Sequence, residues 1–337
     1  MNNSKEPKFL IVRFSSIGDI IQTMSVMDGI LSKFPTARID WITRKDMSGV
    51  LSMDARIGKV WRFDRKSGLS GLVQMAKELR QERYDYIYDA HNNLRSSILK
   101  LILAPFAPLC GAKLAVRSKE RFKRLMLFKF RVNLFDRPFK SVASFQKPLK
   151  KWGITDFPVN KEWSFSASYS DKFDSLVTDN CVTIVPSSNW AMKSWAPEQW
   201  QQLVRELPDH RFVILAGPQD SFCQGIADVA PERVVNMAGR CSLDESCYIV
   251  YKSNIVVSAD TGLMHAADLF RVPTLALMGP TAFGFPSAPT TKILERDMKC
   301  RPCTKDGRGK CKMAVYQQCM VDITPRHVAE CIKDIIG

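Results

Sequence analysis

The sequence lacks long apolar runs. Its most apolar stretch, residues 98–116, is interrupted by two lysines and two prolines, whereas a membrane-spanning helix needs about 20 apolar residues in succession. Near the start of the chain only four apolar residues, Phe9–Val12, stand together, which is too few for the core of a signal peptide. We therefore expect a soluble, cytoplasmic protein.

Acidic residues are scarce relative to basic ones. The 337 residues include 49 Lys and Arg against 34 Asp and Glu, a formal net charge of +15. Residues 1–150 hold 29 basic and 13 acidic residues, and residues 151–337 hold 20 and 21. A basic half joined to a neutral half indicates two different ligands, one of them polyanionic.

Internal repeats and low-complexity tracts are also absent, and 45% hydrophobic with 25% charged residues excludes a disordered or collagen-like chain. Single cores stop growing at about 250 to 300 residues, so this length predicts two domains. Residues 136–170 show little periodicity and contain several prolines. We therefore predict an N-terminal domain of residues 1–160 and a C-terminal domain of residues 161–337.

Short β-rich runs alternate with longer helical patterns in both halves. The first half predicts strands at 9–14, 37–42 and 84–89 and helices at 20–34 and 69–83. The second half predicts strands at 181–185, 211–216, 255–258 and 274–277 and helices from 197, at 221–229 and at 243–252. This alternation is typical of parallel sheets covered by helices. The expected class is α/β, with two doubly wound units.

Ligands of such sheets bind beyond the carboxyl ends of the strands. The segment Ser15–Asp19 follows the first strand and precedes a helix. Gly18 would permit a tight turn there. Asp19 would be either a functional carboxylate or a helix N-cap, which is worth about 1 kcal/mol.

The loop Pro186–Trp195 follows the first strand of the second half. It offers hydroxyl and amide donors and one cation, Lys193, and this combination suits a phosphate. A loop without a ligand is the alternative.

The segment Asp260–His265 follows an apolar strand and opens a helix. Backbone N–H groups of Thr261, Gly262 and Leu263 would point out of the helix end and form a site for a diphosphate. His265, one turn further on, could reach the same anion or be bonded to a neighbouring strand.

Together these segments resemble glycosyltransferase family 9, the bacterial ADP-heptose:lipopolysaccharide heptosyltransferases, over nearly the whole chain. The likeness rests on Arg13–Asp19, Ile39–Trp41, Lys193–Trp195 with Pro197 and Trp200, Val257–Gly262 with His265, and Gly279–Thr281. It implies a GT-B fold, in which two Rossmann-like, doubly wound domains face each other across a cleft. The N-terminal domain would bind the acceptor and the C-terminal domain the nucleotide sugar.

The resemblance also implies roles for individual residues. Asp19 would be the general base that takes the proton of the acceptor hydroxyl, and Lys193 would neutralise the donor diphosphate. The other donor-binding positions would be Ser188, Asn189, Asp220, Cys241, Asp260, Thr261, Gly262, Leu263 and His265. The expected acceptor-binding positions are Ser16, Gly18, Arg117, Arg121 and Arg124.

The implied reaction is an inverting transfer of heptose from ADP-heptose to the lipopolysaccharide inner core, without a metal ion or another cofactor. A lysine and a helix N-terminus can supply the positive potential that a diphosphate leaving group needs. Another nucleotide sugar or glycan acceptor stays open, because the chain has Thr43, Arg44 and Lys45 where family members often have an acidic residue. A catalytically silent lipopolysaccharide-binding protein is the alternative from another class.

The segment 113–140 concentrates the basic charge, with ten basic and two acidic residues interleaved with apolar ones. A basic amphipathic helix can lie on an anionic membrane surface; a solvated helix face is the alternative. Because no nucleic-acid module is recognisable, we expect no nucleic-acid partner. The expected partner is a phosphorylated, lipid-linked acceptor at the inner leaflet of the inner membrane, which the protein would contact peripherally.

Ten cysteines in a cytoplasmic chain predict free or metal-bound thiols rather than disulfides. Cys300, Cys303, Cys311 and Cys319 lie within twenty residues and could form a tetrahedral structural zinc site. Reduced thiols that stabilise the loop, or oxidised ones, are the alternatives. No metal is expected to take part in catalysis.

Overall fold

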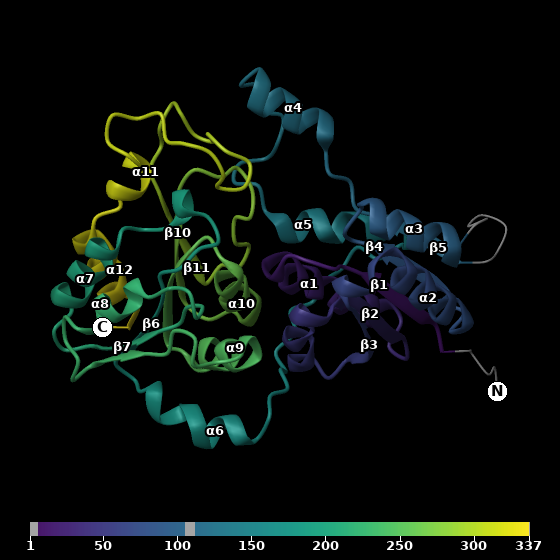
Figure 1. The fold of residues 1–337 in the computed structure, drawn as a ribbon, viewed down its shortest axis with the longest axis horizontal. Coiled ribbons are helices and arrows are strands. Elements are labelled where there is room, and N and C mark those ends of the chain that lie inside the picture. Colours follow the sequence, from purple (N-terminus) through teal and green to yellow (C-terminus); the bar gives the residue numbers. More distant parts are fainter. Residues whose placement is uncertain (1–5, 105–111, 337) are drawn as a thin grey trace. The chain divides into compact units, whose positions relative to one another are not determined.

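The computed structural model describes residues 6–104 and 112–336. The chain divides into two compact units, each with one parallel sheet (Figure 1). The first unit comprises the residues up to 121 together with 142–164, and the second comprises residues 122–141 and those from 165 onward. The predicted α/β class with two doubly wound sheets is confirmed.

The first sheet has the strand order β3-β2-β1-β4-β5, and all its strands are parallel. Its strands are β1 (Lys8–Val12), β2 (Arg38–Arg44), β3 (Ile57–Phe63), β4 (Tyr86–Asp89) and β5 (Lys113–Val116). The strand order reverses direction between β1 and β4. A crevice for ligands is therefore expected where these two strands end.

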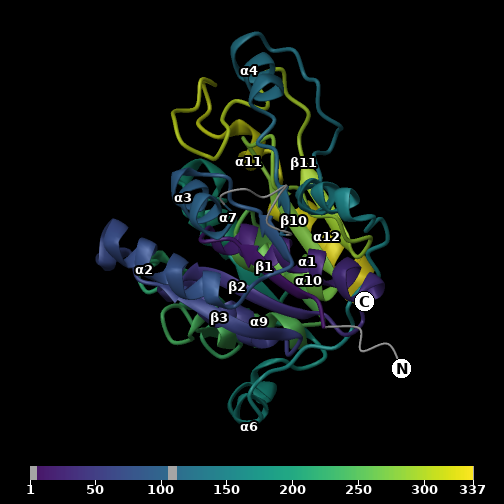
Figure 2. The same ribbon diagram turned by 90° about the vertical axis from the view of Figure 1, so that its right-hand side faces the viewer.

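Helices cover both faces of this sheet (Figures 1 and 2). The helices α2 (Gly68–Gln81) and α3 (Leu94–Leu103) pack on the face that carries Leu10 and Val12. The helix α1 (Ile17–Lys33) lies on the other face and is buried from Ile20 to Ile30. The short helix α5 (Ser141–Gln146) completes this unit.

The second sheet has the order β11-β10-β9-β6-β7-β8, again with all strands parallel. Its strands are β6 (Cys181–Val185), β7 (Arg211–Ile214), β8 (Val234–Asn236), β9 (Ile255–Ala259), β10 (Thr274–Met278) and β11 (Thr291–Glu295). The order reverses between β6 and β9, which gives this sheet its own switch point.

The second sheet is also covered on both faces (Figure 1). One face packs against α7 (Pro197–Glu206), α8 (Phe222–Ala227) and α12 (Pro325–Ile336), and the other against α9 (Leu243–Lys252) and α10 (Gly262–Phe270). The remaining α-helices are α4 (Arg121–Lys129), α6 (Ser168–Phe173) and α11 (Gln318–Val321). None of the helices in the described ranges is long and apolar enough to cross a bilayer.

Residues 122–141, which include most of α4, pack within the second unit. The rings of Phe139 and Phe283 meet edge to face, with centroids 5.1 Å apart. Arg131 donates a hydrogen bond of 2.7 Å to the carbonyl oxygen of Pro302. The chain thus leaves the first unit after α4 begins and returns to it at residue 142.

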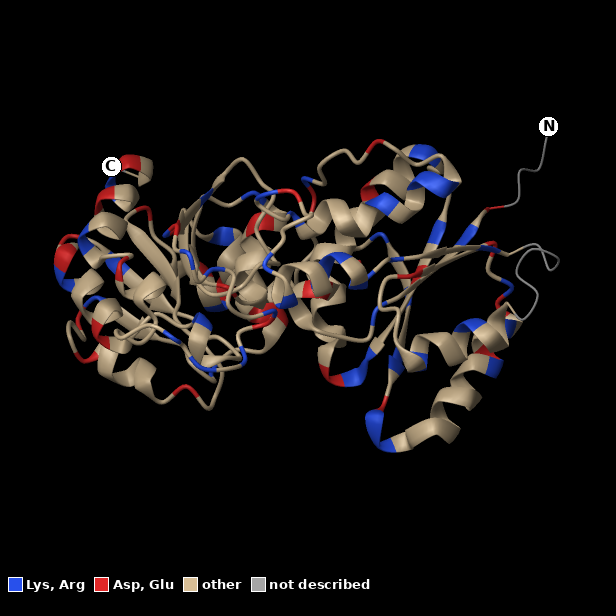
Figure 3. Cartoon of the chain, turned by 90° about the horizontal axis from the view of Figure 1, so that it is seen from above, with Lys and Arg blue, Asp and Glu red and all other residues tan. Residues whose placement is uncertain are grey.

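This excursion divides the basic charge between the units. The first unit has 25 Lys and Arg against 14 Asp and Glu, and the second has 24 against 20. Residues 122–141 supply six of those basic residues and one acidic residue. Lys and Arg, blue in Figure 3, accordingly appear on both units, although the sequence places the excess in the first 150 residues.

Candidate active site

The first candidate site lies where β1 and β4 end side by side. Arg13 follows β1 and is buried, and its guanidinium donates to the carbonyl oxygen of Ala90 at 2.7 Å. Asp89 ends β4, and its carboxylate accepts from the backbone N–H of His91 at 3.0 Å and pairs with Lys100 at 2.7 Å. Arg13 therefore ties the end of β1 to the residue that follows β4, while Asp89 is held by Lys100 of α3.

Asp19 is the third residue of α1, and Ser16 is the N-cap of this helix. The Asp19 Oδ2 atom accepts from the Ser16 hydroxyl at 2.9 Å and from the Ser16 N–H at 3.4 Å. The possibility that Asp19 is itself the N-cap is therefore wrong. Gly18 lies in the first turn of the helix, so the tight turn predicted there is wrong as well.

Two arginines face the Asp19 carboxylate. Arg13 forms an ion pair with it, and the Arg117 guanidinium lies 4.0 Å from Oδ1. Arg117 is held by stacking on the Phe145 ring, 3.6 Å from its centroid. Burial opposes the charge on Asp19, but Arg13, Arg117 and the hydrogen bonds from Ser16 outweigh it and lower the pKa to about 2.

These contacts define what Asp19 can do. The carboxylate is ionised at neutral pH, and 34% of the side chain remains exposed, so an approaching hydroxyl group can reach it. The Asp19 carboxylate can accept a proton from that hydroxyl group, although its low pKa makes it a weak base. The adjacent arginines can in turn bind an anion that enters beside the hydroxyl.

Replacing Arg117 by alanine is expected to raise the pKa of Asp19 from about 2 toward its ordinary value of 3.8, because one of the two facing cations is lost. A carbon-13 NMR titration of the Asp19 carboxyl group measures this change. Because the folded pKa lies below the unfolded one, Asp19 stabilises the fold above about pH 4, and this contribution is lost toward pH 2. In the variant, the stability that Asp19 contributes and that is lost on acidification is smaller. An unchanged pKa of Asp19 would contradict the role of Arg117 in lowering it.

His91 belongs to this site, although sequence reasoning does not single it out. Its ring lies edge-on to Phe14, with centroids 5.7 Å apart. Burial, aided by the charges of Arg13 and Lys119, lowers its pKa to about 4, so the imidazole is neutral at pH 7. Its place directly after β4, at the switch point, is the signal that could have identified it.

The predicted acceptor residues fall into two groups. Ser16 and Arg117 contact Asp19, and Gly18 lies in the same helical turn. Arg121 and Arg124 are on α4 instead, and Arg124 stacks on the Phe283 ring of the second unit at 4.3 Å.

The second candidate site lies where β6 and β9 end side by side. The Lys193 ammonium group pairs with the Asp260 carboxylate at 2.7 Å. The Thr281 hydroxyl donates to the same carboxylate oxygen at 2.9 Å, and the Ser188 hydroxyl donates to the Asp260 carbonyl oxygen at 3.4 Å. Asn189, in the same loop as Ser188, is exposed.

The N-terminus of α10 opens at this point. Thr261 is the N-cap, Gly262 is the first helical residue, and Leu263 follows in the first turn. The first backbone N–H groups of a helix have no acceptor within it and carry the positive end of its dipole. Lys193 and this helix end therefore provide positive potential at one place.

His265 is buried in the same helix, one turn further on. Gly284 lies directly over it and over Asp260, with a left-handed φ of +87°. A Cβ atom at this position would lie 3.5 Å from the Asp260 carboxylate and 3.8 Å from the His265 ring. The loop after β10 therefore closes one side of the site.

The other predicted donor contacts lie at the ends of β7 and β8. Asp220 accepts from the Gly217 N–H at 2.7 Å within the loop after β7. Gly239 donates to the Ala216 carbonyl oxygen at 3.0 Å and so joins this loop to the one after β8. Cys241 follows there, and its burial raises the pKa of the thiol to about 11. All these positions share the carboxyl edge of the sheet.

The cysteine-bearing segment packs beside the second site. The Cys303 N–H donates to the Pro280 carbonyl oxygen at 3.1 Å. Gly307 lies so close to Lys193 that a Cβ atom there would be 2.9 Å from its Cγ atom. The cysteines of the segment are free thiols. In the described part of the chain, no three His, Cys, Asp or Glu side chains are arranged to hold a metal ion.

Two α/β units, each with a sheet of parallel strands and a charged site at the switch point of that sheet, define a GT-B type of protein. Residues 72–314 match the family described as glycosyltransferase family 9 (heptosyltransferase). The lipopolysaccharide core heptosyltransferase OpsX of Haemophilus influenzae is 24% identical over 284 residues, which cover 81% of this chain and 80% of that protein.

Solved structures share the fold. The glycosyl transferase family 9 protein of Veillonella parvula gives a TM-score of 0.77 at 17% identity and covers 98% of this chain and 97% of its own. The Escherichia coli heptosyltransferase WaaC with ADP gives 0.70 at 18% identity, with coverages of 97% and 99%. This chain belongs to glycosyltransferase family 9 and is a glycosyltransferase of the heptosyltransferase type.

Proposed function

We propose that this protein transfers heptose from ADP-heptose to the lipopolysaccharide core. The observation that carries the proposal is the ion pair of Lys193 with Asp260 at the N-terminus of α10, which suits a diphosphate. The family and the name of the Haemophilus relative support heptose transfer to this acceptor. The ADP bound in the Escherichia coli structure supports an adenine nucleotide sugar as donor.

On the donor side, negative charge develops on the diphosphate oxygen as the bond to the sugar breaks. Lys193 and the first N–H groups of α10 would stabilise that charge, because they are already oriented before the reaction. Asp260 holds Lys193 in place, and Thr281 fixes the carboxylate of Asp260. Since these groups supply the positive potential, the proposed mechanism needs no metal ion.

On the acceptor side, Asp19 would accept the proton of the attacking hydroxyl group. The hydroxyl oxygen would displace ADP directly, so the anomeric configuration would be inverted. Arg13 and Arg117 would bind a phosphate group of the inner-core acceptor. Sharing their charge with that phosphate would weaken their hold on Asp19 and raise its pKa, which makes it a better base when the acceptor is bound.

Release of ADP from ADP-heptose by the purified protein, with truncated lipopolysaccharides as acceptors, tests this function. A panel of other nucleotide sugars at the same concentration provides the comparison. We expect turnover with ADP-heptose only, and only when an acceptor is present. Faster turnover with another sugar nucleotide would favour a different donor. Binding without turnover of any donor would favour a silent binding protein.

We also infer peripheral contact with the cytoplasmic leaflet of the inner membrane. The helix α4 and the residues that follow it expose several large apolar side chains, among them Phe122 at 67%, Leu125 at 50% and Phe130 at 55%. Lys123 and Lys129 lie between them. Apolar side chains flanked by lysines suit an anionic bilayer surface that presents a lipid-linked acceptor.

Replacing Lys123 and Lys129 together by glutamine is expected to weaken binding to vesicles that contain anionic lipid by about 30-fold, since each charge contributes about 1 kcal/mol. Vesicle sedimentation measures the effect. The matched control replaces Lys252 and Lys333 by glutamine; these residues lie on α9 and α12. This control is expected to bind the vesicles as tightly as the wild type. Binding that does not depend on lipid charge would contradict membrane contact through α4.

A further inference from the structure

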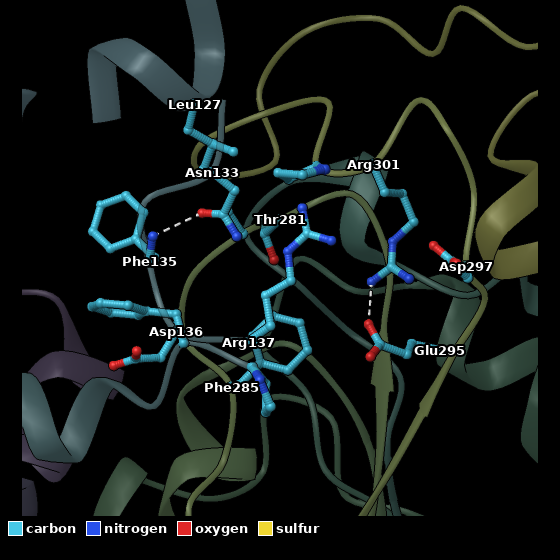
Figure 4. Close-up of a pocket in the computed structure, with 14 residues that line it drawn as sticks. Leu127, Asn133, Phe135, Asp136, Arg137, Thr281, Phe285, Glu295, Asp297 and Arg301 are labelled. Atoms are coloured by element: carbon cyan, nitrogen blue, oxygen red, sulfur yellow. Dashed lines mark hydrogen bonds and ion pairs between the residues drawn. The ribbon is translucent and has the colours of Figure 1, made fainter. Parts of the chain in front are cut away.

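A cavity of about 490 Å³ lies within the second unit and is not assigned by the proposed mechanism. Its walls come from two parts of the sequence, residues 127–139 on one side and residues 281–302 on the other (Figure 4). The volume is in the usual range for sites that bind small molecules. The segment that carries α4 therefore completes this cavity.

Phenylalanine rings form the apolar part of the wall. Phe285 is buried, and the rings of Phe135 and Phe139 meet edge to face with centroids 5.2 Å apart. Both also pack against Phe283, at 5.2 Å and 5.1 Å. Each ring is thus held by its neighbours, so the apolar wall is formed before any ligand binds.

Polar side chains complete the wall. Arg137 extends across the middle of the cavity toward Thr281 (Figure 4). Asn133 accepts from the Phe135 N–H at 3.0 Å through its side-chain oxygen, which leaves its amide NH₂ group available. Among the residues that the structure describes, Arg137 and Asp297 form neither a hydrogen bond nor an ion pair. The cavity therefore offers both donors and acceptors.

The balance of charge limits the ligand. Arg301 is already bound to Glu295 at 2.6 Å and to the Gly279 carbonyl oxygen at 2.6 Å. Arg137 then remains as the one cation of the lining without a partner in the described residues, and Asp136 and Asp297 line the cavity as well. Two carboxylates against one free cation disfavour a phosphate or carboxylate ligand.

We propose that this cavity binds an uncharged sugar ring. Sugar hydroxyls can accept from the guanidinium and amide groups and donate to the carboxylates, while the C–H face of the ring packs on the phenyl rings. Thr281 connects the cavity to the second candidate site, because it lines the cavity and donates to Asp260. The identification of the sugar as a heptose rests on the proposed function. The binding of a neutral sugar in this cavity does not rest on it.

The proposal is tested by measuring the binding of methyl heptoside to the full-length protein. Saturation-transfer NMR at saturating ADP measures this binding. We expect saturable binding that weakens about tenfold or more in Arg137→Ala and in Asp297→Asn, since each loses a hydrogen bond that involves a charged group. Neither side chain has a partner in the described residues, so both variants are expected to keep their melting temperature. Lys292→Ala, on β11 of the same unit but outside the cavity, is the matched control.

The arms of the experiment separate the possible sources of the sugar. Binding that persists when ADP-2-deoxy-2-fluoro heptose replaces ADP assigns the cavity to a sugar of the acceptor, and competition assigns it to the donor; both support a sugar site. Tighter binding of a phosphorylated heptoside, or equal binding by wild type and both variants, overturns the proposal. Turnover of ADP-heptose is measured separately, so failure of the proposed function is distinguishable from failure of this site.

Discussion

Replacing Asp19 by asparagine is expected to lower kcat by about 10²- to 10⁴-fold, the usual contribution of a general base, while the affinity for ADP-heptose stays nearly unchanged. Asparagine has nearly the same shape and can still accept from Ser16, but it cannot take up the acceptor proton. Steady-state ADP release gives kcat, and calorimetry with ADP-heptose gives the donor affinity.

Asp19 also accepts from the backbone N–H of Ser16, so a control must separate its role as a general base from its role in the helix cap. Asp64 is a carboxylate of the same unit that accepts from the Lys66 N–H at 2.8 Å and lies outside both candidate sites. Asp64→Asn is expected to turn over normally. If Asp19→Asn did so as well, Asp19 would be only part of a helix cap.

Replacing Lys193 by methionine is expected to lower kcat/KM by about 10²- to 10³-fold, the usual loss when one preorganised group that stabilises transition-state charge is removed. ADP binding should weaken too, because Lys193 would contact the diphosphate before and after transfer. The substitution also leaves the buried Asp260 without its cation. The double variant Lys193→Met with Asp260→Asn restores neutrality and shows whether stability contributes to the loss.

Lys172 supplies the matched control for Lys193. It is an exposed lysine of the second unit that pairs with Glu245, and Lys172→Met is expected to keep normal kinetics. If Lys193→Met retained both ADP affinity and turnover, the ion pair with Asp260 would be purely structural. The diphosphate would then have to bind elsewhere on the sheet edge.

The central strands of both sheets were predictable from the sequence, and the edge strands were not. The missed strands β3, β5, β8 and β11 are the four sheet edges. Central strands such as β6 and β9 are buried at every residue and read as continuous apolar runs. Edge strands such as β3 and β11 carry exposed charged residues, because an edge faces water and is protected from pairing by charge. Their sequences therefore lack the strand pattern.

The local parts of the two sites were predictable for a similar reason. The segments around Asp19 and Asp260 combine a strand, a turn and a helix within a few residues, so their pattern is visible in the sequence. Contacts between distant residues were not predictable. The stacking of Arg117 on Phe145, the place of His91, and the packing of residues 122–141 in the second unit all depend on tertiary packing, which no local pattern encodes.

The most direct measurement of the central claim is the structure of the product formed from ADP-heptose and a truncated lipopolysaccharide acceptor. Mass spectrometry of the acceptor is expected to show the addition of one heptosyl residue, and NMR of the new linkage is expected to show the anomeric configuration inverted relative to the donor. An unchanged acceptor mass while ADP-heptose is supplied would contradict heptose transfer. A retained anomeric configuration would contradict direct displacement assisted by Asp19.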